Sequence, residues 1–345
     1  MNIRFGALSR TALGVAVMAA FGLNATDALA KKSTDKLNVA IVAVNYNSPT
    51  IQEMSDVAMA DCKKRGWNCE LHDGKGDQVA TNNAATNFIN RKFDAIINIA
   101  SDNNQMGAVI KAANAAKIPF VSAFSGDVPG VTADIGANGV MDGAIVANEM
   151  KSAIDYKGHV VLFNWNVLPT LRDRTQGVKA AMLDAKGITV TEIEVKVPGQ
   201  VEDVYNRLTT LLQGNKDING VIVGWDELGA PAVRAVEQAK MADKIKVMGM
   251  DGIQPVYDLM RKGNSAYTMS VAYSKKSIAE KTVDVVADAI DGKKIPFRAL
   301  WTRTCLVTKE IVPKAGQEMD FKTCTPFSGE VSRSNFVISP YAAIV

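Results

Sequence analysis

The feature that most constrains the fold is an alternation of short apolar runs with amphipathic helical segments. Residues 160–183, VVLFNWNVLPTLRDRTQGVKAAML, show the repeating unit clearly. Val160–Phe163 has the length and β-branched character of a buried parallel strand, a polar turn follows from Asn164 to Thr170, and a helix with one apolar face comes next. A strand, turn and helix in this order form half of a βαβ unit, so the chain is expected to build parallel sheets.

The turn after this strand lies where binding residues are expected. In open α/β sheets, ligands bind outside the carboxyl ends of the strands. Arg172 and Arg174 stand in the first turn of the following helix, where a cation gains nothing from the helix dipole. Two roles therefore remain open for these basic residues: an ion pair with the adjacent Asp173, or contact with a ligand.

The same alternation runs along most of the chain. Further strands are expected at Asn38–Val44, Cys69–His72, Ala95–Ala100, Pro119–Ala123, Ile188–Val195, Val221–Gly224, Lys246–Met250 and Tyr267–Ala272. Helices are expected after most of them, ending near Arg65, Arg91, Ala116, Ile154, Gln213, Met241 and Ile290. Strands alternating with helices predict doubly wound parallel sheets, and more than eight strands predict two such sheets. Two similar lobes would place their strand ends face to face and form a cleft.

Residues 1–30 have the features of a signal peptide. Arg4 and Arg10 form a basic region, Thr11–Leu23 is apolar, and Ala28–Ala30 is a small-residue cleavage site. Because a bilayer crossing needs about 20 apolar residues, this run is too short to span a membrane. The mature protein is therefore expected to be soluble and exported; an uncleaved anchor is the alternative.

Four cysteines lie in two local pairs, Cys62 with Cys69 and Cys305 with Cys324. In an exported protein this arrangement indicates two disulfides. Three connectivities are possible, and the local one requires no long-range coincidence. Free buried thiols do not suit an oxidising compartment, and the two histidines of the chain have no metal-ligand spacing to these cysteines.

Composition and motifs argue against several classes of function. The formal net charge of +3 gives no case for binding nucleic acid or a membrane surface. There is no G-x-S-x-G, Walker or H-E-x-x-H motif, and Gly74–Gly76 lacks the third glycine of a dinucleotide fingerprint. Nothing in the sequence identifies a reaction, so we expect neither an enzyme nor a cofactor.

Several segments together resemble a known family. In order they are LNVAIVAVNYNSP, KIPFVSAF, ADIGANGVMDGAIVANEM, LRDRTQGVKAAM, INGVIVGWDELGAPAVRAVEQA, KVMGMDG and AYTMSVAYSKKSIAEKTVDVVADAIDGK. As a set they are similar to the type I periplasmic solute-binding proteins of the ribose- and galactose-binding kind. The resemblance extends to about Ile311.

The resemblance implies two Rossmann-like lobes joined by three crossovers. The crossovers are expected near Asp134–Gly136, near Val271 and near Leu300–Cys305. The N-terminal lobe would comprise residues 31–134 and 272–303. The C-terminal lobe and tail would comprise residues 135–271 and 304–345.

The resemblance also implies a function. A type I binding protein is a periplasmic monomer that captures a small solute by hinge closure and delivers it to the membrane permease of an ABC transporter. The alternative is a sensory protein that presents its bound metabolite to a membrane kinase or chemoreceptor.

Two residues match binding positions of the family. Arg172 falls where family members use an arginine to clamp sugar hydroxyls, and Asp251 falls on an aspartate that accepts hydrogen bonds from the ligand. A turn role is the alternative for Asp251, since Gly252 follows it.

Other positions depart from the sugar-binding pattern. Thr50 and Ile51 replace two aromatics after the first strand, and Tyr46 with Asn47 lies upstream, where Asn47 could instead bond its own backbone. Phe124 and Ser125 stand where ribose binders have Asp-Arg, Trp225 replaces an asparagine, and Val271 replaces a glutamine. Trp225 could alternatively cap the core. The expected ligand contacts are Tyr46, Asn47, Phe124, Arg172, Trp225 and Asp251, and the expected ligand is less polar than ribose: a modified sugar, a polyol-like or aromatic metabolite, or a small amine.

Overall fold

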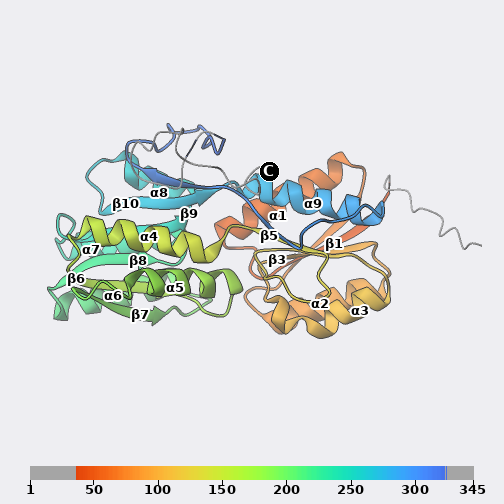
Figure 1. Ribbon diagram of the computed structural model, residues 1–345, viewed down its shortest axis with the longest axis horizontal. Coiled ribbons are helices and arrows are strands. Elements are labelled where there is room, and N and C mark those ends of the chain that lie inside the picture. Colours follow the sequence, from red (N-terminus) through yellow and green to blue (C-terminus); the bar gives the residue numbers. More distant parts are fainter. Residues whose placement is uncertain (1–35, 323, 325–345) are drawn as a thin grey trace, which may run out of the picture. The chain divides into compact units, whose positions relative to one another are not determined.

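The computed structural model describes residues 36–322 and residue 324. It contains two six-stranded sheets, as the alternating pattern predicts. Figure 1 shows each sheet with helices on both of its faces. The predicted signal peptide lies outside the described residues. Within the described part of the chain, no helix is both long and apolar enough to cross a bilayer.

The first sheet is built mainly from the N-terminal half of the chain. Its strands are β1 (Asn38–Ala43), β2 (Asn68–Asp73), β3 (Ala95–Ile99), β4 (Phe120–Ala123), β5 (Ala133–Gly136) and β11 (Ala299–Trp301). They lie in the order β11-β5-β4-β3-β1-β2, and every neighbouring pair is parallel. In this doubly wound order the connecting helices are divided between the two faces of the sheet.

Helices cover both faces of this sheet because its strands are apolar on both sides. The helices are α1 (Pro49–Lys64), α2 (Gln78–Asn90), α3 (Gly107–Ala115) and α9 (Lys275–Ile290), with a short 3₁₀ turn η1 (Asn103–Gln105). Val39 and Ile41 of β1 belong to the core that contains α1 and α9, whereas Ala40 and Val42 belong to the core under α2 and α3. Alternate residues of a strand point to opposite faces, so a continuous apolar run serves both layers.

The second sheet repeats the arrangement. Its strands are β6 (Gly158–Asn164), β7 (Ile188–Glu194), β8 (Ile218–Val223), β9 (Lys246–Asp251), β10 (Tyr267–Tyr273) and β12 (Thr304–Thr308). They lie in the order β12-β10-β9-β8-β6-β7, and only β10 and β12 pair in the antiparallel direction.

Two groups of helices cover this second sheet. They are α4 (Gly139–Ala153), α5 (Pro169–Met182), α6 (Gln200–Gly214), α7 (Gly229–Gln238) and α8 (Gln254–Arg261), with the 3₁₀ turn η2 (Asp226–Leu228). Met150 of α4 and Val178 of α5 pack on one face of the sheet, and Leu208 of α6 and Val236 of α7 contribute to the core on the other. Figure 1 shows α4 and α5 side by side, where they pack closely against each other.

The chain passes between the two sheets three times. It leaves the first sheet after β5 to enter α4, returns after β10 to enter α9, and passes from β11 to β12 at its end. Strands β5, β11 and β12 are not among the strands expected from the sequence. They are 4, 3 and 5 residues long, and β11 and β12 are edge strands, so little local periodicity marks them.

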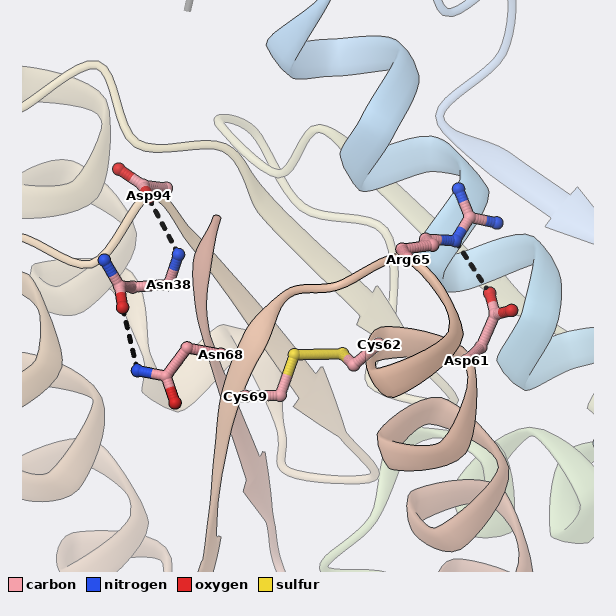
Figure 2. Close-up of a disulfide and its surroundings, with 7 residues drawn as sticks. All are labelled: Asn38, Asp61, Cys62, Arg65, Asn68, Cys69 and Asp94. Carbon is pink, nitrogen blue, oxygen red and sulfur yellow. Dashed lines mark hydrogen bonds and ion pairs between the residues drawn. A yellow bond between two sulfur atoms is a disulfide. The ribbon is translucent and has the colours of Figure 1, made fainter. Parts of the chain in front are cut away.

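Both predicted disulfides are present. Cys62, near the end of α1, is bonded to Cys69 in β2, as Figure 2 shows, and Cys305 of β12 is bonded to Cys324. Each bridge fixes a helix end or the final segment to a neighbouring strand. In Figure 2 the first bridge lies beside the pair Asp61–Arg65 and the hydrogen bond between Asn38 and Asn68.

Candidate functional site

A pocket opens at the carboxyl ends of strands from both sheets. It holds about 600 Å³ of empty space, its open mouth included. The first sheet and its helices contribute Asn45, Ser48, Thr50, Ile51, Met54, Ala100 and Phe124. The second contributes Trp165, Leu168, Thr170, Leu171, Arg174, Val197, Gln200, Trp225, Glu227, Asp251 and Tyr273. About half of the lining residues are apolar, and four are aromatic.

A buried ion pair forms the polar floor of the pocket. The Arg174 guanidinium donates to Oδ1 of Asp251 at 2.8 Å and to the carbonyl oxygen of Gly224 at 2.7 Å. The Tyr273 hydroxyl donates to the same Asp251 oxygen at 2.6 Å. Although burial disfavours a charge on Arg174, the Asp251 carboxylate raises the pKa of the guanidinium above its ordinary value. Burial and the same carboxylate raise the pKa of Tyr273, so its hydroxyl stays protonated. The cluster is therefore polar but carries no net charge.

A further carboxyl group, Asp142 of α4, lies behind this ion pair. Its side chain is fully buried, and within the described part of the chain neither oxygen meets the geometry of a hydrogen bond, although the Thr304 hydroxyl is close enough to lower its pKa. Burial raises the pKa of Asp142 to about 7; Arg174 opposes this rise and Asp251 reinforces it. Its charge near neutral pH is accordingly only partial.

The turn that carries Asp251 is held by a second buried network. The Asp226 carboxylate accepts hydrogen bonds from the Gly252 amide at 2.7 Å, from the Ser270 hydroxyl at 2.6 Å and from the Tyr267 hydroxyl. Burial, reinforced by Asp251, raises the pKa of Asp226 to about 6. Asp251 has a backbone φ of 133°, which is unfavourable for a residue with a side chain. The network fixes this strained conformation, and with it the direction of the Asp251 carboxylate.

Glu227 provides a separate carboxylate near Trp225. Its Oε1 accepts from the Gln200 side chain at 2.9 Å, and its Oε2 accepts from the Trp225 indole at 3.0 Å and the Ser48 hydroxyl at 3.3 Å. All three donors are neutral. Ser48 comes from the first sheet's side of the pocket, so this contact also links the two lobes.

Other hydrogen bonds also cross the pocket. The Thr50 hydroxyl donates to Oδ2 of Asp251 at 2.9 Å, and the Thr170 hydroxyl donates to the carbonyl oxygen of Phe124 at 3.2 Å. Arg172 forms an ion pair with Asp102 at 3.0 Å. These contacts hold the two walls of the pocket together.

The six residues expected to bind the ligand divide into two groups. Phe124, Trp225 and Asp251 line the pocket. Tyr46 instead donates to Asp56 at 2.6 Å, Asn47 is exposed, and Arg172 donates to the carbonyl oxygens of Asn166 and Val167 as well as to Asp102. The binding role of each of the six stays a prediction.

Several lining residues were not among those expected from the sequence. The arginine of the pocket is Arg174. It lies on the same helical face as Leu171, three residues earlier, and Val178, four residues later. That spacing was a usable signal, whereas no local signal marks Tyr273 or Glu227. Val271, expected to add apolar surface to the cleft, instead packs in the core between the sheet and α4.

Comparison of the sequence with known proteins identifies the family of this chain. The sequence profile described as "periplasmic binding protein domain" matches residues 20–294. The ribose import binding protein of Salmonella typhimurium is 24% identical over 286 residues, which cover 81% of this chain and 93% of the relative. A D-apiose import binding protein of Paraburkholderia graminis is 26% identical over 242 residues, covering 67% of this chain and 74% of the relative.

Solved structures share the fold. An ABC transporter solute-binding protein from Agrobacterium vitis, crystallised with allitol, has a TM-score of 0.77 at 21% identity and covers 81% of this chain and 98% of its own. The 5-methylthioribose transporter solute-binding protein of Thermotoga lettingae has a TM-score of 0.75 at 22% identity and covers 79% of this chain and 87% of its own. At these identities the likeness concerns the fold alone.

Proposed function

The chain belongs to the periplasmic binding protein family, and from this premise we propose that it captures one small organic solute in its pocket and delivers the solute to the permease of an ABC transporter. It is a binding protein and not an enzyme, since its relatives and fold neighbours are binding proteins of transporters. The family is periplasmic, and we take residues 1–30 to be the export signal of this member.

The observation that carries the proposal is that both lobes supply the walls of a single pocket. Thr50 from α1 and Asp251 from β9 are 201 residues apart in the chain and meet across it at 2.9 Å. A ligand in this position contacts both lobes at once, so it favours the arrangement in which they are close together. The three connections between the two sheets suit a hinge.

The lining supports a sugar-like solute that is less polar than ribose. Relatives are named for the import of ribose and D-apiose, and the fold neighbours hold allitol and 5-methylthioribose. In this chain, Phe124, Trp165 and Trp225 supply broad apolar faces, while Arg174 and Asp251 neutralise each other in a buried ion pair. Leaving a buried polar group unpaired costs about 1–3 kcal/mol, so a ligand rich in hydroxyls would lose affinity here.

A binding screen tests this proposal. Thermal unfolding should be measured with sugars, deoxy and alkylated sugars, polyols, aromatic acids and amines, since a ligand at a hundredfold excess over Kd stabilises the protein by about 2.7 kcal/mol. The stabilising compound should also reduce the radius of gyration in small-angle scattering. A compound whose binding is unchanged in Trp225→Ala and Asp251→Asn would contradict the proposed site.

Delivery to a permease requires a second measurement. Uptake of the identified solute should be lost in cells that lack this chain and restored by the wild type. If uptake stays normal while a membrane kinase or chemoreceptor no longer responds to the solute, the sensory function replaces transport.

A further inference from the structure

The charges that line the pocket do not sum to zero. Arg174, Asp251 and Glu227 are the lining residues with charged side chains at neutral pH. Arg174 and Asp251 are only 2% and 3% exposed and lie 2.8 Å apart, so they neutralise each other. The charge of Glu227 remains, and the pocket lining carries one net negative charge.

Glu227 has no cationic partner among residues 36–322. Its three side-chain donors are Gln200, Trp225 and Ser48, and all are neutral. The terminal nitrogens of the Arg174 guanidinium already donate to Asp251, the Gly224 carbonyl and Tyr273, and only its Nε lacks a partner within the described residues. Glu227 is partly buried, and a buried carboxylate is normally paired with a cation because burial of a charge is costly. The solute is the remaining candidate for that partner.

Two indole rings line the same pocket, and no lysine or arginine of residues 36–322 lies over either ring. Lysine or arginine lies over the rings of Trp67, Phe88, Phe93, Tyr205 and Tyr273 in the described part of the chain. Neither Trp165 nor Trp225 has such a neighbour there, although both line the pocket. Because the Trp225 indole donates to Glu227, its ring is fixed beside that carboxylate. A negative charge next to an indole ring is a favourable setting for an organic cation.

The charged groups behind the pocket do not cancel the net negative charge of its lining. Lys275 donates to the carbonyl oxygens of Asp251 and Gly252 and lies 3.7 Å from Glu53, so it has its own anionic partner. Asp142 and Asp226 are both buried near the Arg174–Asp251 pair and can only add negative charge.

We infer that the solute captured in this pocket is a monovalent organic cation, an ammonium or alkylated ammonium group on an apolar or lightly hydroxylated body. The inference rests on the proposed function. The charge lies against Glu227 and the indoles, and the body extends toward the neutral Arg174–Asp251–Tyr273 cluster, which can hold a hydroxyl group. Carboxylates, phosphates and other anions are excluded by the same charge balance.

Pairs of compounds matched in shape and different in charge test the inference. Choline is compared with 3,3-dimethylbutan-1-ol, and glucosamine with glucose, by calorimetry on the full mature chain. We expect the cation of at least one pair to bind tenfold or more tightly than its neutral partner, a preference of about 1.4 kcal/mol. Glu227→Gln should reduce that preference to less than about threefold. The control is Glu237→Gln, on the exposed surface of α7, which should leave the preference unchanged.

Each outcome decides the inference. Equal or tighter binding of both neutral partners overturns it, as does a cation preference that survives in Glu227→Gln. If Glu227→Gln does not fold, Trp225→Phe takes its place, because it removes the indole donor and weakens the ring's attraction for a cation; an unchanged preference there overturns the inference. Binding of allitol is measured in parallel. If allitol binds tightly and compacts the protein while neither cation binds, the inference is overturned but the proposed function stands. If no compound in either the thermal-unfolding screen or this calorimetric comparison binds, both the inference and the proposed function are overturned.

Discussion

At the scale of single residues, the site depends on which of two nearby arginines faces inward. Arg172 is one-third exposed and donates to backbone carbonyls and Asp102, whereas Arg174 is almost fully buried and holds Asp251. They differ by two residues on one helix, which turns their side chains about 200° apart. The family resemblance pointed to Arg172; the helical spacing from Leu171 would have pointed to Arg174, but the prediction did not use it.

Removing the buried arginine should therefore be far more costly than removing the exposed one. Arg174→Met leaves Asp251 and Asp142 buried without their cation, and we expect a loss of about 3–5 kcal/mol in the free energy of unfolding. Arg172→Met is the comparison on the same helix and should cost less, about 1–2 kcal/mol, because the buried Asp102 keeps the two hydrogen bonds that Asn104 donates. Urea unfolding of both variants at neutral pH checks this; equal losses would show that Arg174 is not the centre of the network.

The buried Asp142 carboxyl predicts a pH-dependent stability. Burial raises its pKa from 3.8 to about 7, so between these values the native state holds a proton that the unfolded chain has released. This group therefore makes the protein less stable as the pH rises from about 4 to about 7, by roughly 1.4 kcal/mol per pH unit. Asp142→Asn removes the effect, and its stability relative to the wild type should rise by about 2–3 kcal/mol between about pH 5 and pH 7.

Urea titrations at several pH values measure this slope. The exposed Asp155 is the control, and Asp155→Asn should keep the wild-type pH profile. Parallel profiles of the wild type and Asp142→Asn would show that Asp142 does not take up a proton in this range.

At the scale of elements, the closeness of α4 and α5 positions Arg174. A Cβ atom at Gly143 would lie 2.1 Å from the carbonyl oxygen of Arg174, and one at Gly177 would lie 2.1 Å from that of Val140. Both atoms that would clash belong to the backbone, so they cannot move away by a change of side-chain rotamer. Each glycine therefore allows the two helix backbones to approach, and this approach sets the depth of the arginine beneath the pocket.

Gly143→Ala should consequently separate the helices. We expect a loss of about 3 kcal/mol in unfolding free energy and weaker ligand binding, because α5 shifts together with Arg174. Gly214→Ala is the control: it lies at the end of α6 with open space around its Cβ position, and there alanine should be neutral or stabilising by up to about 1 kcal/mol. Calorimetry of ligand binding and urea unfolding measure both effects. Wild-type stability in Gly143→Ala would contradict the close-contact argument.

At the scale of the whole molecule, a few polar contacts hold the lobes together around the pocket. Thr50 to Asp251 and Ser48 to Glu227 are side-chain hydrogen bonds across it. A single hydrogen bond contributes about 1 kcal/mol net, so two of them can shift an equilibrium between open and closed forms by a factor of roughly 10 to 30. The polar residues that line the pocket therefore also set how closed the empty protein is.

The double variant Ser48→Ala, Thr50→Val removes these contacts at little cost in volume. Without ligand, we expect a larger radius of gyration in small-angle scattering than for the wild type, because the open form gains population. Thr210→Val, at an exposed position of α6 where the hydroxyl bonds only its own helix, should leave the radius unchanged. An unaltered radius in the double variant would mean that other contacts determine closure.

The sequence by itself determined the architecture and the covalent links. The two largely parallel sheets follow from the alternation of apolar runs and amphipathic helices, and both disulfides follow from cysteines that are close in the chain. These are local properties, so a single window of residues contains them. The short strands β5 and β11 were not predicted, because pairing with neighbouring strands, not local periodicity, defines them.

Only the tertiary structure decided the composition of the site. Phe124, Trp225 and Asp251 stand at strand ends, where the pattern alone favours a binding position, and all three line the pocket. Tyr273 and Glu227 could not be chosen in this way, because their roles come from partners 99 and 179 residues away in the chain, Arg174 and Ser48. The rotation of each helix and the meeting of strand ends from two sheets are set by packing over the whole molecule, and no local pattern records them.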